Sequence, residues 1–408
     1  MLLRRFVFIV LFLTALILAL SSGFLPMSVL AIVIGVSFVV SYCLNKFSLK
    51  GLTIGIDKTP DIGHVGQEVE RLVWIENGSF LPRLWVQIRS MGNLPGVKSL
   101  VTGISGRSPR GWYRIPALLQ NRGRYEWGDI NISSGDPLGL FVSDRNIRSN
   151  VSIIVHPRVV DITDFALSSV DPGSDSSQFL ASADVTPNVV SVRRYNSSDS
   201  MNRIHWVSSA RMNQLMVKEF ELEIQNDLWI ILDLNVDAHQ GTGLDGTEET
   251  AVTVAASIAN HFIYNSNSVG LVGNDAQEFI LSPRSGDRQL SYIFEYLASC
   301  RSDGVTPIKN MLSQDISRLS RQAGVVIITT SDSERITAAT NYLSARNAPG
   351  ALVSIDLESF GLINVDNPEI QENLDTNIPI YSVRKGDDLS KALSFTYARQ
   401  PTSERLMN

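Results

Sequence analysis

Four oxygen-bearing side chains fall where two buried strands are expected to end. Asp233, Asn235 and Asp237 alternate at the end of the apolar run 228–234, and Asp332 follows the apolar run 325–329. The carboxyl ends of parallel strands meet at one edge of a sheet, so these side chains should lie close together. Carboxylate and amide oxygens suit hard cations such as Mg²⁺ or Ca²⁺, which predicts a candidate cation site. The alternative is that Asp233 and Asp332 cap loops and helix N-termini without an ion.

A second group that could do chemistry consists of Asp199, Arg203 and His205. A histidine beside an arginine and an aspartate can act as a general base, and the chain would then be a hydrolase-like enzyme. The sequence has no Walker-type phosphate loop, no Gly-x-Ser-x-Gly elbow and no well-placed Cys/His pair. We therefore favour the alternative, in which His205 packs and forms hydrogen bonds and the chain is not an enzyme.

The stretch around His205 is expected to join a short helix to an edge strand. Asp199 or Ser200 can cap the helix. Ile204, Val207 and Ala210 would form its apolar stripe. The strand covers residues 215–224. Basic side chains concentrate here and form a candidate partner-docking surface, which consists of Arg193, Arg194, Arg203, His205 and Arg211. The alternative is that these arginines pair with the acidic run of Glu219, Glu221 and Glu223.

Residues 191–385 alternate between buried strands and helices. Strands are expected at 228–234, 269–272, 278–281, 325–329 and 351–355, with helices at 247–265, 288–299, 308–322 and 333–346. This alternation predicts an α/β doubly wound sheet. A C-terminal helix or tail occupies residues 386–408, and a linker rich in Ser, Asp and Pro occupies residues 161–190.

Residues 49–160 show short alternating stretches separated by turn residues, which predicts an all-β sandwich of immunoglobulin or fibronectin type. The Asn77-Gly78 step is typical of a tight hairpin turn. The stretch Gly-Asp-Pro-Leu-Gly-Leu-Phe at 135–141 is interpreted as a turn whose Leu138, Leu140 and Phe141 close one end of the sandwich. A binding site is the alternative.

Residues 1–48 contain two apolar runs, 6–20 and 27–44, each close to the roughly 20 residues that cross a bilayer as a helix. They predict a transmembrane hairpin in the inner (cytoplasmic) membrane. A cleaved signal peptide is the alternative, which the immediate second run argues against. Arg4 and Arg5 precede the first run and Lys46 and Lys50 follow the second, so the positive-inside rule places the soluble domains in the cytoplasm.

Composition excludes several classes of protein. A net charge of −6 offers no general attraction to nucleic acid. Two cysteines supply neither a disulfide framework nor a thiolate cluster, and the five histidines lack the spacing of a helical zinc site.

The block 192–223 carries a family resemblance. It contains Arg193-x-Tyr195, Asp199, Arg203-Ile-His-Trp206, Ser209-Ala-Arg211 and Val217-Lys-Glu-Phe-Glu221, and together with Gly-Asp-Pro-Leu-Gly-Leu-Phe it strongly resembles the domain-of-unknown-function-58 (DUF58) family. The family's usual glycine after Tyr195 is Asn196 here. The α/β region also resembles von Willebrand A domains, whose Asp-x-Ser-x-Ser metal loop is altered here to Asp233-Leu-Asn235-Val-Asp237.

The resemblance implies an integral membrane protein, found in bacteria and archaea, whose activity is not established. It further implies partners encoded nearby, namely a MoxR-type AAA ATPase and a transglutaminase-like membrane protein. We therefore expect a scaffold or binding protein that works in assembly or maturation of a membrane or envelope complex.

Overall fold

The fold is taken from a computed structural model of the full chain. It describes residues 2–394 apart from residues 24, 81, 169–181, 196–203, 213, 226, 240, 242, 244–245, 316–318, 320–322, 347 and 362–377. The chain divides into two compact units, Met1–His156 and Pro157–Asn408. Each unit has hydrophobic cores of its own.

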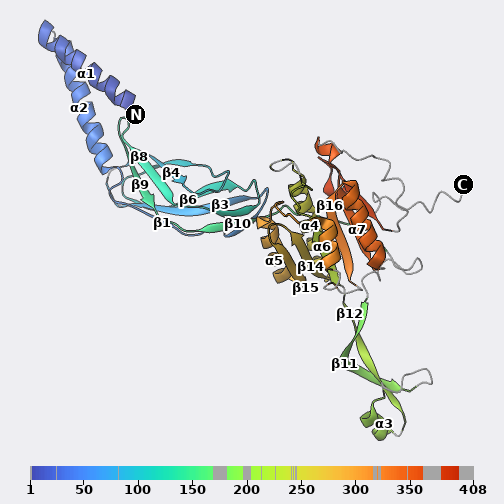
Figure 1. The fold of residues 1–408 in the computed structure, drawn as a ribbon. Helices are drawn as coiled ribbons and strands as arrows, with labels where there is room; N and C mark the ends of the chain where they lie inside the picture. Colours follow the sequence, from blue (N-terminus) through green and yellow to red (C-terminus); the bar gives the residue numbers. More distant parts are fainter. Residues whose placement is uncertain are drawn as a thin grey trace. The chain divides into compact units, whose positions relative to one another are not determined.

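The first unit begins with two apolar helices, α1 (Leu2–Ser22) and α2 (Leu25–Phe47) (Figure 1). They pack on each other through Ala15, Ala31 and Ile34, with Phe8 and Phe12 beside them. Most of their other apolar side chains are exposed. By length and composition both helices could cross a membrane. The predicted pair of N-terminal apolar helices is therefore present.

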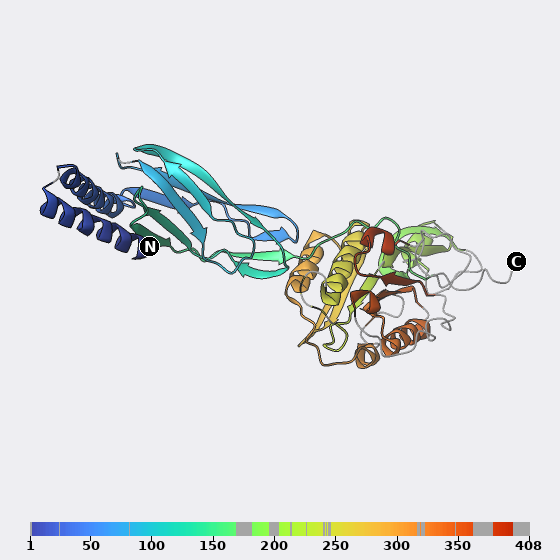
Figure 2. The same cartoon turned by 90° about the horizontal axis from the view of Figure 1, so that it is seen from above.

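The remainder of this unit consists of strands. β1 (Leu52–Ile56), β3 (Glu68–Asn77) and β6 (Ser108–Leu118) form one sheet, and β5 (Leu100–Ile104), β4 (Arg83–Ser90), β8 (Ile130–Gly135) and β9 (Val142–Ile147) form a second (Figure 2). The two sheets pack face to face over a core that includes Val73, Ile115, Val86 and Ile132. A third sheet contains β2 (Ile62–His64), β10 (Ser152–His156) and β7 (Gly123–Glu126). The β-rich region expected from the alternating pattern is therefore observed.

The Asn77-Gly78 step does not form the expected tight hairpin. β3 and β4, which flank it, belong to different sheets. Asn77 is buried, and its side chain accepts a hydrogen bond from the Ser79 amide and donates one to the Ser105 carbonyl. These bonds hold the chain where it crosses from one sheet to the other.

The second unit is built on a six-stranded sheet of order β15-β14-β13-β16-β17-β18. The strands are β13 (Asp227–Leu232), β14 (Ser268–Asn274), β15 (Glu278–Arg284), β16 (Gly324–Thr330), β17 (Gly350–Ile355) and β18 (Ile380–Val383). β15 is antiparallel to β14, and the other neighbours are parallel. Sequence reasoning did not predict β18.

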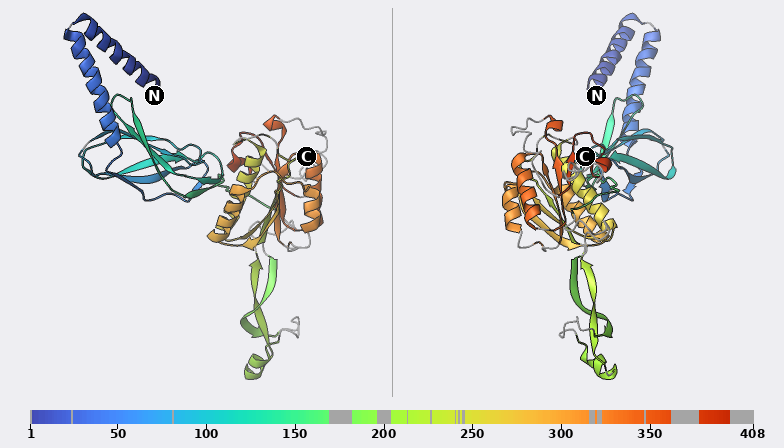
Figure 3. Two further views of the ribbon diagram at one scale, coloured as in Figure 1. Left: turned by 60° about the vertical axis from the view of Figure 1, so that its left-hand side comes forward. Right: turned by 90° about the vertical axis from the view of Figure 1, so that its right-hand side faces the viewer.

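Helices cover both faces of this sheet (Figure 3). α4 (Thr247–Tyr264), α5 (Asp287–Ser299) and α8 (Leu389–Ala392) share one core, and α6 (Ile308–Asp315) and α7 (Ser333–Arg346) share the other. The expected doubly wound sheet is therefore observed.

The segment predicted as a linker is only partly a connection. Ile162, Phe165 and Leu167 are buried in the core that contains α4. The Phe165 ring stacks on Tyr381 at 4.5 Å, and the Tyr381 hydroxyl donates to the Ala166 carbonyl. These three apolar residues dock a segment without regular secondary structure onto the core.

β11 (Ser182–Arg194) begins inside that same predicted linker. It pairs with β12 (Met216–Gln225) as an antiparallel ribbon outside the six-stranded sheet. A short helix, α3 (Trp206–Met212), lies between the two strands in sequence and at the far end of the ribbon in Figure 3. Residues 182–225 are called the arm below, and the described residues from Arg194 to Met216 are called the arm tip.

Candidate functional site

The strand order of the six-stranded sheet reverses between β13 and β16, and such reversals are where doubly wound sheets bind ligands. Asp233 directly follows β13, Asn274 ends β14, and Thr329 lies near the end of β16. Helix α7 begins three residues after β16 and brings Arg335 to the same place. We call these residues, with Asn235 and Asp332, the carboxyl edge.

Asp233 is fully buried at the centre of the carboxyl edge. Its Oδ2 accepts hydrogen bonds from Thr329 Oγ1 at 2.8 Å and Arg335 Nη1 at 2.9 Å. Its Oδ1 accepts from the Asn235 amide at 3.2 Å and from Asn274 Nδ2 at 3.4 Å. A buried carboxylate requires such compensation, because a charge taken out of water without partners is very costly.

Arg335 joins three of the four residues predicted as cation ligands. Besides Asp233, its Nη2 donates to Asn235 Oδ1 at 3.2 Å, and its Nε lies 3.3 Å from Asp332 Oδ2. The Arg335 side chain is only 13% exposed. Sequence reasoning missed this residue, although its spacing of three from Asp332 at a helix start was a usable signal.

The arrangement does not fit a resident divalent cation while Arg335 is in place. Both Asp233 oxygens already accept two donors each, and Asn235 Oδ1 accepts from Arg335 and from the Asp237 amide at 3.0 Å. The fourth predicted ligand, Asp237, is exposed. Among the residues that the structure describes, no three His, Cys, Asp or Glu side chains are grouped to hold a metal. The cation site stays a prediction from the sequence.

His239 is buried beside the carboxyl edge and contacts the loop that follows β13. Its Nε2 lies 2.6 Å from the Asp233 carbonyl oxygen and must donate to it, so Nδ1 accepts from Thr247 Oγ1 at 3.2 Å. Burial lowers the pKa of His239 below 6.5, and the bond to the Asp233 carbonyl partly opposes this. The imidazole is therefore held neutral.

At the arm tip, His205 caps helix α3. Its Nδ1 accepts from the Ser208 amide at 3.2 Å and lies 2.8 Å from Ser208 Oγ. Its own amide donates to the Met216 carbonyl on β12. Ser209 Oγ donates to the His205 carbonyl and accepts from the Met216 amide. These bonds dock α3 on the start of β12.

This docking differs from the expected apolar stripe. The helix begins at Trp206, so Ile204 lies before it and forms a bridge to Val217. Ser209 faces inward, whereas Val207 and Ala210 are exposed. The expected stripe is therefore wrong. His205 caps a helix that begins at Trp206, so Ile204 is not a helical residue and Ser209 is the buried position of the helix.

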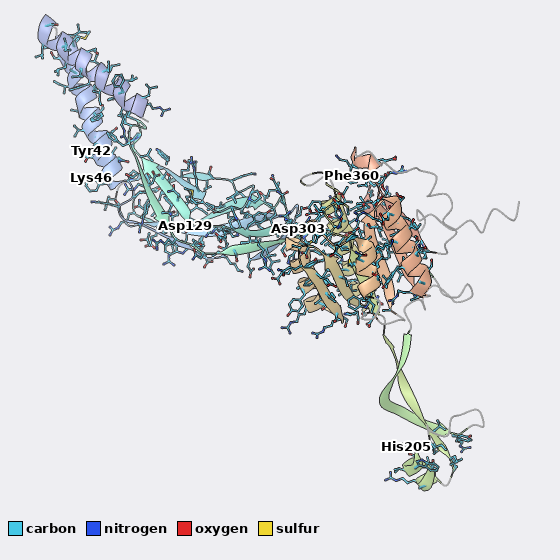
Figure 4. The ribbon with its side chains drawn as sticks, viewed as in Figure 1. Tyr42, Lys46, Asp129, His205, Asp303 and Phe360 are labelled. Carbon is cyan, nitrogen blue, oxygen red and sulfur yellow. The ribbon has the colours of Figure 1, made fainter. Side chains whose placement is uncertain are left out.

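The outer side of the arm tip combines apolar and basic side chains. Trp206, Val207 and Met212 are 67%, 60% and 61% exposed, and Arg194 and Arg211 are also exposed. Figure 4 labels His205 at this end of the arm. Of the other residues predicted to act here, Asp199, Arg203 and the side chain of Arg193 lie outside the described residues.

The 136–141 loop docks on the ends of the apolar helices. Asp136 is fully buried and accepts from the Leu138 amide at 3.0 Å, the Phe141 amide at 2.6 Å and Ser41 Oγ at 2.9 Å. The Phe141 ring contacts Phe38 and Tyr42 of α2. Tyr42 lies at the end of α2 nearest the strands (Figure 4).

Helix α1 completes this contact. Arg5 Nε donates to the Leu140 carbonyl at 2.6 Å, and the Arg5 guanidinium lies 4.7 Å from the Phe141 ring centroid. The predicted turn exists, but Leu138 is exposed and Phe141 faces the helices rather than closing the sandwich.

Comparisons with known proteins identify the family to which most of the second unit is similar. A family model described as "Protein of unknown function DUF58" matches residues 191–390, which include most of the arm and the whole carboxyl edge. The chain belongs to the DUF58 family. The predicted resemblance is therefore confirmed, and the matched range places the candidate sites of the second unit inside the DUF58 region.

One curated relative is "Uncharacterized protein YeaD" of Bacillus subtilis (strain 168). It is 26% identical over 215 residues, which are 51% of this DUF58 chain and 50% of YeaD. The match thus spans about half the length of that relative.

Solved structures give weaker likenesses. The CARDB domain of the PF1109 protein from Pyrococcus furiosus is 20% identical, with 26% of this chain and 91% of that chain covered and a TM-score of 0.19. Alpha-2-macroglobulin from Escherichia coli is 15% identical, with 32% and 9% covered and a TM-score of 0.20. These TM-scores are too low to support a shared fold.

Proposed function

We propose that this DUF58 protein is a membrane-anchored, non-enzymatic binding protein whose arm tip docks a MoxR-type AAA ATPase. The observation that carries the proposal is the exposure of Trp206, Val207 and Met212 on helix α3, which lies between the two strands of a ribbon outside the main sheet. Exposed apolar side chains on such an element gain free energy when a partner covers them. Tryptophan and arginine are the residue types that most often dominate binding energy at interfaces.

The chemistry of the arm tip defines the partner surface. Arg194 and Arg211 are exposed on the same arm tip as the apolar side chains, so we propose that the complementary surface is an apolar groove with acidic residues at its rim. A membrane-anchored scaffold that presents such a tip would hold the ATPase during assembly or maturation of a membrane or envelope complex. A transglutaminase-like membrane protein is the second proposed partner.

Three side chains that could perform catalysis are committed to structural bonds, which supports a binding role. Asp233 accepts four donors, both ring nitrogens of His239 have partners, and Nδ1 of His205 caps α3. A general base needs an accessible lone pair directed at a substrate. Of the residues on which the alternative hydrolase hypothesis is built, Asp199 and Arg203 lie outside the described residues.

The location and the finer fold assignments belong to the same proposal. α1 and α2 form a hairpin across the cytoplasmic membrane, with Arg4, Arg5, Lys46 and Lys50 on the cytoplasmic side. The strands that follow form an immunoglobulin-like sandwich, and the second unit is a von Willebrand A-like domain with an altered metal loop. The strands of the first unit and the whole of the second unit then lie in the cytoplasm.

Crosslinking and mass spectrometry from native membranes tests the proposal. The wild-type chain should recover a MoxR-type ATPase, and Trp206→Ala should reduce the recovered amount by roughly tenfold or more, as expected for the loss of a central aromatic side chain. Trp112→Ala is the matched control, because Trp112 is a 54% exposed tryptophan on β6. Equal recovery by Trp206→Ala and wild type would contradict docking through the arm tip.

A further inference from the structure

The carboxyl edge has the layout of an ion site, but one of the chain's own side chains fills it. Asp233 Oδ2, Asn235 Oδ1 and Asp332 Oδ2 converge on one guanidinium at 2.9, 3.2 and 3.3 Å. They do so at the reversal of strand order, the usual place for a ligand in a doubly wound sheet. We propose that the Arg335 guanidinium is a built-in cation that takes the place of a divalent metal ion at the carboxyl edge.

The charges support this assignment. Asp233 is completely buried, so its carboxylate needs a permanent positive partner in contact. A guanidinium stays protonated at every physiological pH and presents a rigid fork of donors, which suits three oxygens in different directions. Asp332 keeps some exposure and lies three residues before Arg335, so the same arginine also pairs with the carboxylate that precedes α7.

Arg335 and a divalent ion exclude each other. Mg²⁺ and Ca²⁺ take oxygen ligands at about 2.0 to 2.6 Å, inside the space that the guanidinium nitrogens occupy. The oxygens in question already have their donors from Arg335, Thr329 and backbone amides. Metal binding at this place therefore requires that Arg335 leave.

A built-in cation has a mechanical consequence. Through Asp233 and Asn235, Arg335 ties α7 to the loop after β13, and through Asp233 it reaches Asn274 at the end of β14 and Thr329 of β16. The loops at this edge are thus held in one arrangement whatever the concentration of divalent ions. The same oxygens would form an acidic cation site once the guanidinium is removed.

The test measures thermal unfolding of the full-length chain in detergent, with and without Mg²⁺, Mn²⁺ or Ca²⁺. Wild type should show no change of Tm with any of these ions or with a chelator. Arg335→Ala should lower Tm by roughly 5 to 15 °C, because it leaves a buried carboxylate without its cation. At least one divalent ion should then recover part of that loss. Arg288→Ala, which removes an exposed arginine on α5, should behave as wild type.

Several outcomes would overturn the proposal. A Tm of Arg335→Ala equal to wild type would show that the guanidinium does not hold the edge. A destabilised Arg335→Ala that no divalent ion recovers would show that the oxygens do not form a cation site. Should Arg335→Ala fail to fold, calorimetric titration of wild type and Arg335→Lys with Mn²⁺ decides. Neither protein should give binding heat. Binding heat from wild type that is lost in Asp233→Asn would show that a metal binds beside Arg335, which contradicts the proposal.

Discussion

His239 makes the stability of the α/β unit depend on pH. Its pKa in the folded chain is lowered by burial from the ordinary value of 6.5. The folded state therefore favours the neutral ring, and the stabilisation is complete above pH 6.5. As pH falls below 6.5, the unfolded chain gains a proton that the folded chain resists, so the free energy of unfolding decreases until the folded pKa is passed.

Replacing His239 by Gln should remove this pH dependence. The Gln amide can still donate toward the Asp233 carbonyl, but it does not titrate. We expect a lower Tm than wild type at pH 7.5 and a smaller decrease of Tm between pH 7.5 and pH 5.5. His261, whose pKa burial also lowers, stays in both proteins and contributes equally. An unchanged difference between the two pH values would show that His239 is not responsible.

The carboxyl edge shows which residues of a site a sequence can reveal. Asp233, Asn235 and Asp332 were predictable, because strand ends in a parallel sheet converge by topology alone. For Arg335 the sequence offered only its spacing of three from Asp332, which suggests a pair with that carboxylate, whereas the side-chain rotamer decides that its guanidinium also reaches Asp233 and Asn235. His205 was expected to form hydrogen bonds and does so, while its role as a helix cap depends on a start at Trp206 that propensities do not define to one residue.

The 136–141 loop joins two elements that sequence reasoning treated separately. The Asp136-Pro137 pair and the neighbouring glycines predicted a turn, since these residues favour turn conformations. That the turn docks on α1 and α2 was not predictable from local pattern, because Ser41 lies 95 residues from Asp136. The buried Asp136 carboxylate of this loop thus links the apolar helices to the strands of the first unit.

Asp136 and Ser41 should therefore show coupled contributions to stability. Ser41→Ala removes one donor to a buried carboxylate, and Asp136→Asn removes the charge that accepts three hydrogen bonds. Each should lower the free energy of unfolding by about 1 to 3 kcal/mol. The double variant should lose less than the sum of the single losses, because the two residues share one bond.

Thermal unfolding of the full chain in detergent gives these values. Ser21→Ala is the matched control, since the Ser21 hydroxyl bonds only its own helix, at the Leu18 carbonyl, and is exposed. Strict additivity of the Ser41 and Asp136 effects would contradict the proposed link.

The order of the domains along the chain followed from changes of periodicity. The chain shows apolar runs first, then alternating strands, and then an alternation of strands and helices. Each pattern places its buried apolar residues at a different spacing. β11 escaped this logic, because it lies in a stretch rich in polar residues and finds its partner β12 only after the arm tip. β12 itself was expected as the strand at residues 215–224.

The proposed orientation of the two apolar helices can be tested on the intact chain. With Cys43 replaced by Ser, the remaining Cys300 is buried and should not react. Single cysteines are then introduced by Ser21→Cys, at the connection of the helices, and by Val305→Cys, at an exposed position of the α/β unit. In bacterial spheroplasts, a membrane-impermeant maleimide should label the Ser21→Cys chain at once.

The Val305→Cys chain should react only after the membrane is permeabilised, because the positive flanks retain both soluble units on the cytoplasmic side. The reverse pattern would place the arm and the carboxyl edge outside the cell, where a cytoplasmic ATPase could not reach them. Labelling of both positions in intact spheroplasts would mean that one apolar helix does not span the membrane. Arg4 and Arg5 to Glu substitutions should shift the pattern toward inversion, since the charges that precede the first helix contribute to its orientation.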